Sequence, residues 1–274
     1  MHEIIFLIAL AFIWIVFASV QDLKTRIVAN WISFSLIIFA LGFRFFYSLF
    51  SGDFGFFYYG LIGFGIFFLI GNALYYGRMF AGGDAKLMIA LGAVLPFYGN
   101  FYKNLEILTM FFLIFLFSGA VYGLFWSFIL SARNFKIFKT EFGKQFKRKK
   151  SLIYICTLFG TMLLIFGFFE IIFSYLGILI FILPYFYIYA KAVDESCLVS
   201  KVPVKKLSEG DWLYNDLKIN KKTIKAKWSG LSYGQIKEIK KVYQTVKIRQ
   251  GIPFVPVFLI SFLIFVGIWF FEVV

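Results

Sequence analysis

The stretch Ile4-Ile-Phe-Leu-Ile-Ala-Leu-Ala-Phe-Ile-Trp-Ile-Val-Phe-Ala-Ser-Val20 contains no charged residue. A helix of about 20 apolar residues crosses the hydrocarbon core of a bilayer, and all of its backbone hydrogen bonds close within the helix. Polar residues and Asp22 follow the run directly. The stretch therefore has the length and the polar end of a membrane-spanning segment.

Runs of this kind recur along the whole chain, and they predict about eight transmembrane helices. The second run is interrupted by Arg44, whose side chain we expect to reach toward the outer membrane surface. The predicted spans are residues 4–20, 31–50, 54–77, 85–99, 107–132, 151–169, 171–190 and 252–271.

The composition agrees with this interpretation. Of the 274 residues, 61% are hydrophobic and 15% are charged, whereas soluble domains have about 45–50% and about 25%. These values exclude a soluble globular domain and a disordered chain as the main fold. The predicted fold class is an all-α polytopic membrane protein, located in the plasma membrane.

The positive charges set the predicted orientation. The formal net charge is +14, and all but two of the 28 Lys and Arg residues lie in residues 21–30, 78–86, 133–150 and 191–251. Because cytoplasmic loops are enriched in Lys and Arg, these loops are predicted to be cytosolic and the N-terminus to lie outside. The cations are therefore assigned to membrane lipids as partners and not to nucleic acid.

Residues 191–251 form the one sizeable polar insert, and we predict that it folds as a basic cytosolic α+β module. Strand-like residues precede a turn at Glu209-Gly210-Asp211, and Ser232 begins a capping box followed by Ile236, Ile239, Val242 and Val246 at helical spacing. The predicted domains are a transmembrane core at 1–190, this module at 191–251 and a C-terminal transmembrane helix at 252–274.

Two of the 14 carboxylates are candidates for chemistry. Asp22 ends the first predicted span and Asp84 begins the fourth, so both lie at the cytosolic boundary. Either residue has a simpler explanation when taken alone, because Asp84 suits a helix N-cap and Asp22 suits a solvated charge at the end of a span. If the two helices are neighbours, however, the carboxylates face each other.

Such a pair has the chemistry of an aspartic protease. Two carboxylates held together share one proton, so that one takes a proton from water while the other donates a hydrogen bond to the scissile carbonyl. The single histidine is His2, and the two cysteines, Cys156 and Cys197, are far apart in sequence. We therefore predict neither a metal site nor a cofactor.

The surroundings of both aspartates resemble the motifs of one family. Asp22-Leu-Lys-Thr-Arg-Ile-Val-Ala-Asn30-Trp31 is similar to the first conserved loop of type IV prepilin peptidases, with Val28 and Ala29 in place of the usual Ile-Pro. Ala81-Gly-Gly-Asp-Ala-Lys-Leu87 resembles the second motif, Gly-x-Gly-Asp followed by x-Lys-Leu, with Ala81 in place of the first glycine. Gly251–Val257 resembles the C-terminal segment of archaeal members.

This resemblance to archaeal type IV prepilin and preflagellin (archaellin) peptidases implies a membrane-embedded aspartic endopeptidase of the Gly-x-Gly-Asp type. Its substrates would be prepilin-like or archaellin precursors, cleaved behind a short basic leader at the cytosolic membrane face. Carried over to this chain, the catalytic pair is Asp22 and Asp84. We expect Gly82 and Gly83, which lack Cβ atoms, to admit the substrate backbone beside Asp84.

Two alternatives stay open at this point. Aspartates near glycine-broken helices also occur in ion or solute transporters, and a presenilin-like protease acting within the bilayer uses a similar pair. Gln21 in front of Asp22 disfavours the presenilin-like reading, since that family pairs Tyr-Asp with Gly-x-Gly-Asp. The sequence leaves the precursor that is cut and the oligomeric state undetermined.

Overall fold

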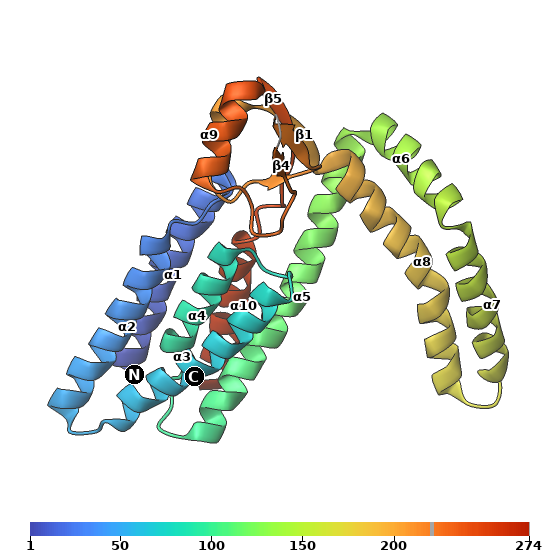
Figure 1. The fold of residues 1–274 in the computed structure, drawn as a ribbon. Coiled ribbons are helices and arrows are strands. Elements are labelled where there is room, and N and C mark those ends of the chain that lie inside the picture. The colour runs from blue at the N-terminus through green and yellow to red at the C-terminus, as the bar shows by residue number, and fades with distance from the viewer. Residues whose placement is uncertain (220–221, 274) are drawn as a thin grey trace. The chain divides into compact units, whose positions relative to one another are not determined.

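A computed structural model describes residues 1–219 and 222–273, and it divides the chain into two compact units. The first unit contains Met1–Gly123 and Gly251–Val274, and the second contains Leu124–Gln250. Both units are mainly helical, and Figure 1 shows their elements. The predicted class, a helical polytopic membrane protein with a small α+β insert, is confirmed.

The first unit is a helical bundle. Figure 1 shows α10 running beside α1, although the two helices come from opposite ends of the chain. The helices of this unit are α1 (His2–Thr25), α2 (Asn30–Ser51), α3 (Gly55–Tyr76), α4 (Gly82–Val94), the first part of α5 (Phe101–Arg133) and α10 (Pro256–Val273).

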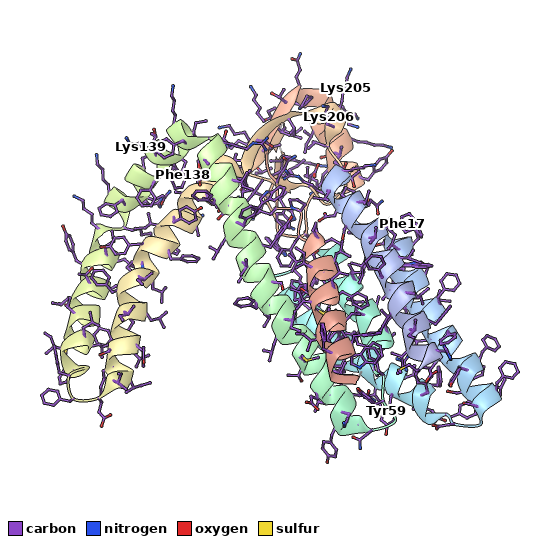
Figure 2. The ribbon with its side chains drawn as sticks, turned by 180° about the vertical axis from the view of Figure 1, so that it is seen from behind. Phe17, Tyr59, Phe138, Lys139, Lys205 and Lys206 are labelled. Carbon is purple, nitrogen blue, oxygen red and sulfur yellow. The ribbon has the colours of Figure 1, made fainter. Side chains whose placement is uncertain are left out.

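Lipid-facing and buried surfaces in this unit follow from the apolar sequence. Large side chains on the outside, such as Phe17 on α1, project away from the neighbouring helices (Figure 2). The interior holds Leu7, Phe67, Phe111 and Phe258, which are fully buried. A soluble protein would not leave so many apolar side chains exposed, whereas a bilayer solvates them.

Five described helices are long and apolar enough to cross a membrane, namely α1, α2, α3, α5 and α8 (Ile171–Cys197). The pair α6 (Phe135–Arg148) and α7 (Lys150–Phe166) is bent by 70° and adds a sixth if it forms one span. Each of the eight predicted spans contains a helix, but α4 has only 13 residues and ends at Val94, and α10 is also short. By length and composition the described residues thus provide five or six membrane-spanning helices, fewer than the eight predicted.

Helix α4 is packed closely against α3. The backbones approach at Gly63 and Gly92, where a Cβ on either residue would meet the carbonyl oxygen of the other. Small residues of this kind allow membrane helices to touch along their backbones. This contact places α4, which begins with Gly82, inside the bundle.

Arg44 of α2 does not extend to the outer surface, which corrects the expectation from the sequence. Its side chain is fully buried and donates hydrogen bonds to the carbonyl oxygens of Phe56, Ala93, Val94 and Pro96. Ala93 and Val94 are the last two residues of α4, where carbonyl groups lack partners within the helix, and Pro96 follows the C-cap Leu95. The guanidinium therefore caps a helix that ends inside the protein.

The second unit contains a helical hairpin and the polar module. Helix α6 is amphipathic: Phe138, Phe142 and Phe146 follow one another at four-residue spacing, and the ring of Phe138 meets that of Tyr189 on α8. Figure 2 shows Phe138 turned toward α8 and Lys139 turned away from it. The two faces of α6 thus differ, with an aromatic face toward α8 and Lys139 on the opposite side.

The polar module has the mixed α+β composition predicted for it. Its antiparallel sheet has the order β1-β5-β2, and β3 pairs with β4 in a second small sheet. Its elements are β1 (Val199–Pro203), a 3₁₀ turn (Val204–Lys206), β2 (Trp212–Leu213), β3 (Leu217–Ile219), β4 (Lys222–Ile224), α9 (Tyr233–Val242) and β5 (Thr245–Arg249).

The capping box at Ser232 is present, since Ser232 and Gln235 exchange side-chain and backbone hydrogen bonds. The helix that it begins stops at Val242, one turn earlier than the spacing indicated. Val246 instead lies in β5, where alternation of buried Val246 and Ile248 with exposed residues is strand-like. Lys205 and Lys206 are exposed on this module (Figure 2).

Candidate active site

Asp22 lies in the last turn of α1 and is only 6% exposed. The helix ends at Arg26, which adopts a left-handed conformation with φ 57° and donates its backbone N–H to the carbonyl of Asp22. The chain then reverses into α2, and the side chain of Gln21 accepts a hydrogen bond from the backbone N–H of Ala29 at 3.0 Å. These contacts fix the turn that follows Asp22 and bring it against α4.

Asp84 is the third residue of α4 and is 8% exposed. The N-cap is Ala81, and the Oδ2 atom of Asp84 accepts the backbone N–H of Ala81 at 3.2 Å. Asp84 therefore is not itself the N-cap, although it satisfies one of the free N–H groups at the start of the helix. A carboxylate that served only as a cap could stay exposed to water, whereas Asp84 is buried and makes this single capping contact.

The structure brings the two aspartates together. Helices α1 and α4 are in contact, and the charge of Asp22 acts directly on the Asp84 carboxyl group. Both groups are nearly excluded from solvent, so their mutual repulsion is poorly screened. Two such carboxylates cannot both be ionised readily, and the pair is suited to hold one proton.

Asp22 also contacts a segment that lies more than 200 residues later in the sequence. Its Oδ2 atom accepts the backbone N–H of Val255 at 3.0 Å, and the N–H of Phe254 also acts on it. Tyr122 of α5 lies close enough to experience the charge of Asp22, and its hydroxyl donates to the carbonyl of Pro253 at 2.9 Å. Sequence reasoning noted residues 251–257 by resemblance only and gave no signal for Tyr122.

The cations near the pair have partners inside the protein. Arg26 donates to the carbonyl of Gly251 at 2.7 Å, and Lys86 donates to the side-chain oxygen of Asn30 at 2.6 Å. Arg26 thus joins the turn after α1 to the segment before α10, and Lys86 joins α4 to the first residue of α2. Among the described residues, no group of three or more His, Cys, Asp or Glu side chains is arranged to hold a metal ion.

Gly82 and Gly83 form the first turn of α4, in helical and not left-handed conformation. A Cβ on Gly83 would lie 3.2 Å from the Cβ of Val28, whereas a Cβ on Gly82 would lie 3.8 Å from Tyr75. Gly82 also lines an apolar cavity of about 380 Å³ between α2, α3 and α4, together with Phe34 and Phe68. Gly83 thus packs against the loop after Asp22, and Gly82 faces open space.

This difference gives a test of the glycine pair. Gly82→Ala meets no close neighbour, so we expect unchanged membrane abundance; if a substrate backbone approaches here, cleavage falls about tenfold because the methyl group occupies that path. Gly83→Ala requires Val28 to shift and is the matched control for packing. Abundance and cleavage rate are measured for both. Normal cleavage by Gly82→Ala would remove Gly82 from the substrate path.

Comparison with known proteins finds a similarity to one class of membrane protease in the first part of the chain. Residues 9–128 match the type IV leader peptidase family, and both Asp22 and Asp84 lie within this region. The match is to the same family that the two aspartate motifs indicated.

A particular relative is a preflagellin peptidase from Methanocaldococcus jannaschii, which is 33% identical over 86 residues. The similarity covers 31% of this chain and spans 36% of that relative's length. No solved structure matches the chain.

Proposed function

We propose that the protein is a membrane-embedded aspartic endopeptidase that removes the basic leader of type IV prepilin-like or archaellin precursors at the cytosolic face of the membrane. The observation that carries the proposal is the meeting of Asp22 and Asp84, two buried carboxylates from helices that are distant in sequence. The family of residues 9–128 and the preflagellin peptidase relative support the substrate class.

The proposed reaction uses the shared proton of the pair. The ionised carboxylate takes a proton from a water molecule, whose oxygen attacks the carbonyl carbon of the scissile peptide bond. The protonated carboxyl group donates a hydrogen bond to the carbonyl oxygen and stabilises the charge that develops on it. The C–N bond then breaks, and the leaving amine takes up a proton from the pair, which restores the shared proton.

The position of the pair at helix ends suits a precursor with two unlike parts. Its leader is basic and water-soluble, whereas the segment after the cleavage point is apolar and helical. Asp22 and Asp84 lie at the end of α1 and the start of α4, so apolar helix surface continues from the site along both helices. A bound precursor can keep its apolar helix in the membrane while its scissile bond reaches the carboxylates.

Membrane vesicles of defined orientation test the proposal. We expect an added precursor with a basic leader to be shortened by inverted vesicles, which expose the cytosolic face, and not by sealed right-side-out vesicles. The measurement is the mass of the product, which gives the cleaved bond. Vesicles without the protein are the control.

Failure of the peptidase function and failure of the predicted orientation give different results in this experiment. Absence of cleavage in both orientations, with intact protein in the vesicles, would contradict the peptidase function and favour the transporter alternative. Cleavage by right-side-out vesicles alone would keep the peptidase function but reverse the orientation inferred from the charged loops.

A further inference from the structure

We propose that the segment Gly251–Val255, held by Tyr122 and Arg26, positions the Asp22 carboxylate for its role as the general base of the pair. The inference rests on the proposed function, and it assigns a positioning role to residues that lie outside both aspartate motifs. It also explains why residues that precede the last helix belong to the same compact unit as α1.

Every second residue of this segment makes a backbone hydrogen bond to a side chain. The carbonyl of Gly251 accepts from Arg26, the carbonyl of Pro253 accepts from Tyr122, and the N–H of Val255 donates to Asp22. Ser19, one turn before Asp22, has its hydroxyl 3.5 Å from the carbonyl of Val255. The segment is thus fixed at three places by side chains of α1, of its C-cap residue Arg26 and of α5, and it presents a backbone donor to the Asp22 carboxylate.

The backbone N–H groups beside Asp22 help to determine which of the two carboxylates is ionised. Hydrogen bonds from N–H groups stabilise the charged form of a carboxylate, because the neutral form accepts them more weakly. Asp22 has the amides of both Phe254 and Val255 beside it, and Arg26 adds a positive charge. Asp84 has one amide contact and experiences the charge of Asp22. The arrangement favours the charge on Asp22 and the proton on Asp84.

The groups that interact with Asp22 come from several elements around it. Arg26, the C-cap residue of α1, and the backbone amides of Phe254 and Val255 act on Asp22, whose charge in turn acts on Asp84 of α4 and Tyr122 of α5. Helix α2 also packs on α1, but its first ionisable residue is Arg44, about four turns from its start. Of these side chains, Tyr122 is the one that can be changed without altering the net charge, because Tyr122→Phe removes only a hydroxyl group.

The test compares Tyr122→Phe with Tyr98→Phe in the full-length protein reconstituted in liposomes. Tyr98 lies in the same unit, and its hydroxyl accepts a hydrogen bond from Trp269 at 3.2 Å, so its removal costs a similar contact elsewhere in the bundle. Loss of the Tyr122 hydroxyl frees the carbonyl of Pro253 and weakens the hold of Val255 on Asp22. The charged form of Asp22 is then less favoured.

For Tyr122→Phe we expect the acidic limb of the pH–rate profile for precursor cleavage to move to higher pH by about half a unit to one unit. The value of kcat falls about tenfold, while KM stays within about twofold, because the carboxylate is misplaced but the leader is still bound. Tyr98→Phe is expected to retain the wild-type profile. If Tyr122→Phe has the same profile as Tyr98→Phe, the positioning role is wrong.

An infrared measurement separates this inference from the proposed function. The carboxyl band of Asp22, identified by subtracting the spectrum of Asp22→Asn, is followed as a function of pH in both tyrosine variants. A shift of its titration to higher pH in Tyr122→Phe alone supports the positioning role even if no precursor is cleaved. An identical titration in wild type and both variants overturns it, whether or not the protein is a peptidase.

Discussion

Asp22→Asn and Asp84→Asn are each expected to reduce leader cleavage by about a thousandfold or more, with protein abundance unchanged. Asparagine has the size of aspartate, and its side-chain oxygen still accepts the N–H of Val255 or of Ala81. It neither takes a proton from water nor donates one as a carboxylic acid. The change therefore removes one function of the pair and leaves the packing in place.

The double variant gives a stricter version of this test. The two carboxylates act as a unit in the proposed reaction, so the loss of both is expected to cost about as much as the loss of one. Asp53→Asn is the matched control, because Asp53 lies in the exposed turn between α2 and α3 and caps the N–H of Gly55. Near-normal cleavage by either single variant in membranes would contradict the assignment of that aspartate.

Stability separates loss of chemistry from loss of fold in these variants. Asp22 and Asp84 are buried side by side, and this burial opposes folding because one charge loses its hydration and the second carboxylate must take up a proton. When a charged residue is kept for function at the expense of stability, replacing it by a neutral residue makes the protein more stable. The single variants are thus expected to unfold at temperatures equal to or above that of the wild type.

The sequence could predict the membrane-spanning helices because their signal is local. Each apolar run must satisfy its own backbone, so an uninterrupted run such as residues 4–20 indicates a helix by itself. The same applies to the capping box at Ser232. The meeting of Asp22 and Asp84 could also be predicted from the sequence. Both residues lie at ends of apolar runs, and the positions of the charged loops predict that these ends are on the same side of the membrane.

What the sequence could not predict depends on contacts between distant segments. Nothing near Tyr122 or Val255 indicates that they meet at Asp22, since 133 residues separate them along the chain. The length of α4 was overestimated because its apolar run continues through Leu95 and Phe97 after the helix has ended. The burial of Arg44 likewise depends on where α4 stops, which the apolar pattern does not record.

Arg44→Met is expected to destabilise the protein strongly, by about 3 kcal/mol or more in the free energy of unfolding. The guanidinium donates to four carbonyl oxygens and lies 4.3 Å from the centre of the Phe56 ring. Methionine fills similar space but donates nothing, and each buried carbonyl left without a partner costs about 1–3 kcal/mol. The measurement is the thermal unfolding midpoint in detergent, with exposed Arg133→Met as the control.

Lysine at position 44 distinguishes charge from geometry. A positive charge at the C-terminal end of α4 interacts favourably with the helix dipole, and Arg44→Lys retains it. An ammonium group, however, lacks the planar fork that reaches carbonyls on two sides. We therefore expect Arg44→Lys to fall between wild type and Arg44→Met. Equal stability of lysine and arginine would show that charge alone matters at this position.

Gly60 on α3 tests the same contact without changing the arginine. A Cβ at Gly60 would meet the Cδ and Nε atoms of Arg44, so Gly60→Ala must displace the side chain from the end of α4. Gly65→Ala is the matched control, since Gly65 lies on the same helix and nothing stands within 4 Å of its Cβ position. We expect Gly60→Ala to lower the unfolding midpoint and Gly65→Ala to leave it unchanged. Because α4 also positions Asp84, cleavage by Gly60→Ala should fall with stability; a stable Gly60→Ala variant would mean that Arg44 is not needed to hold the end of α4.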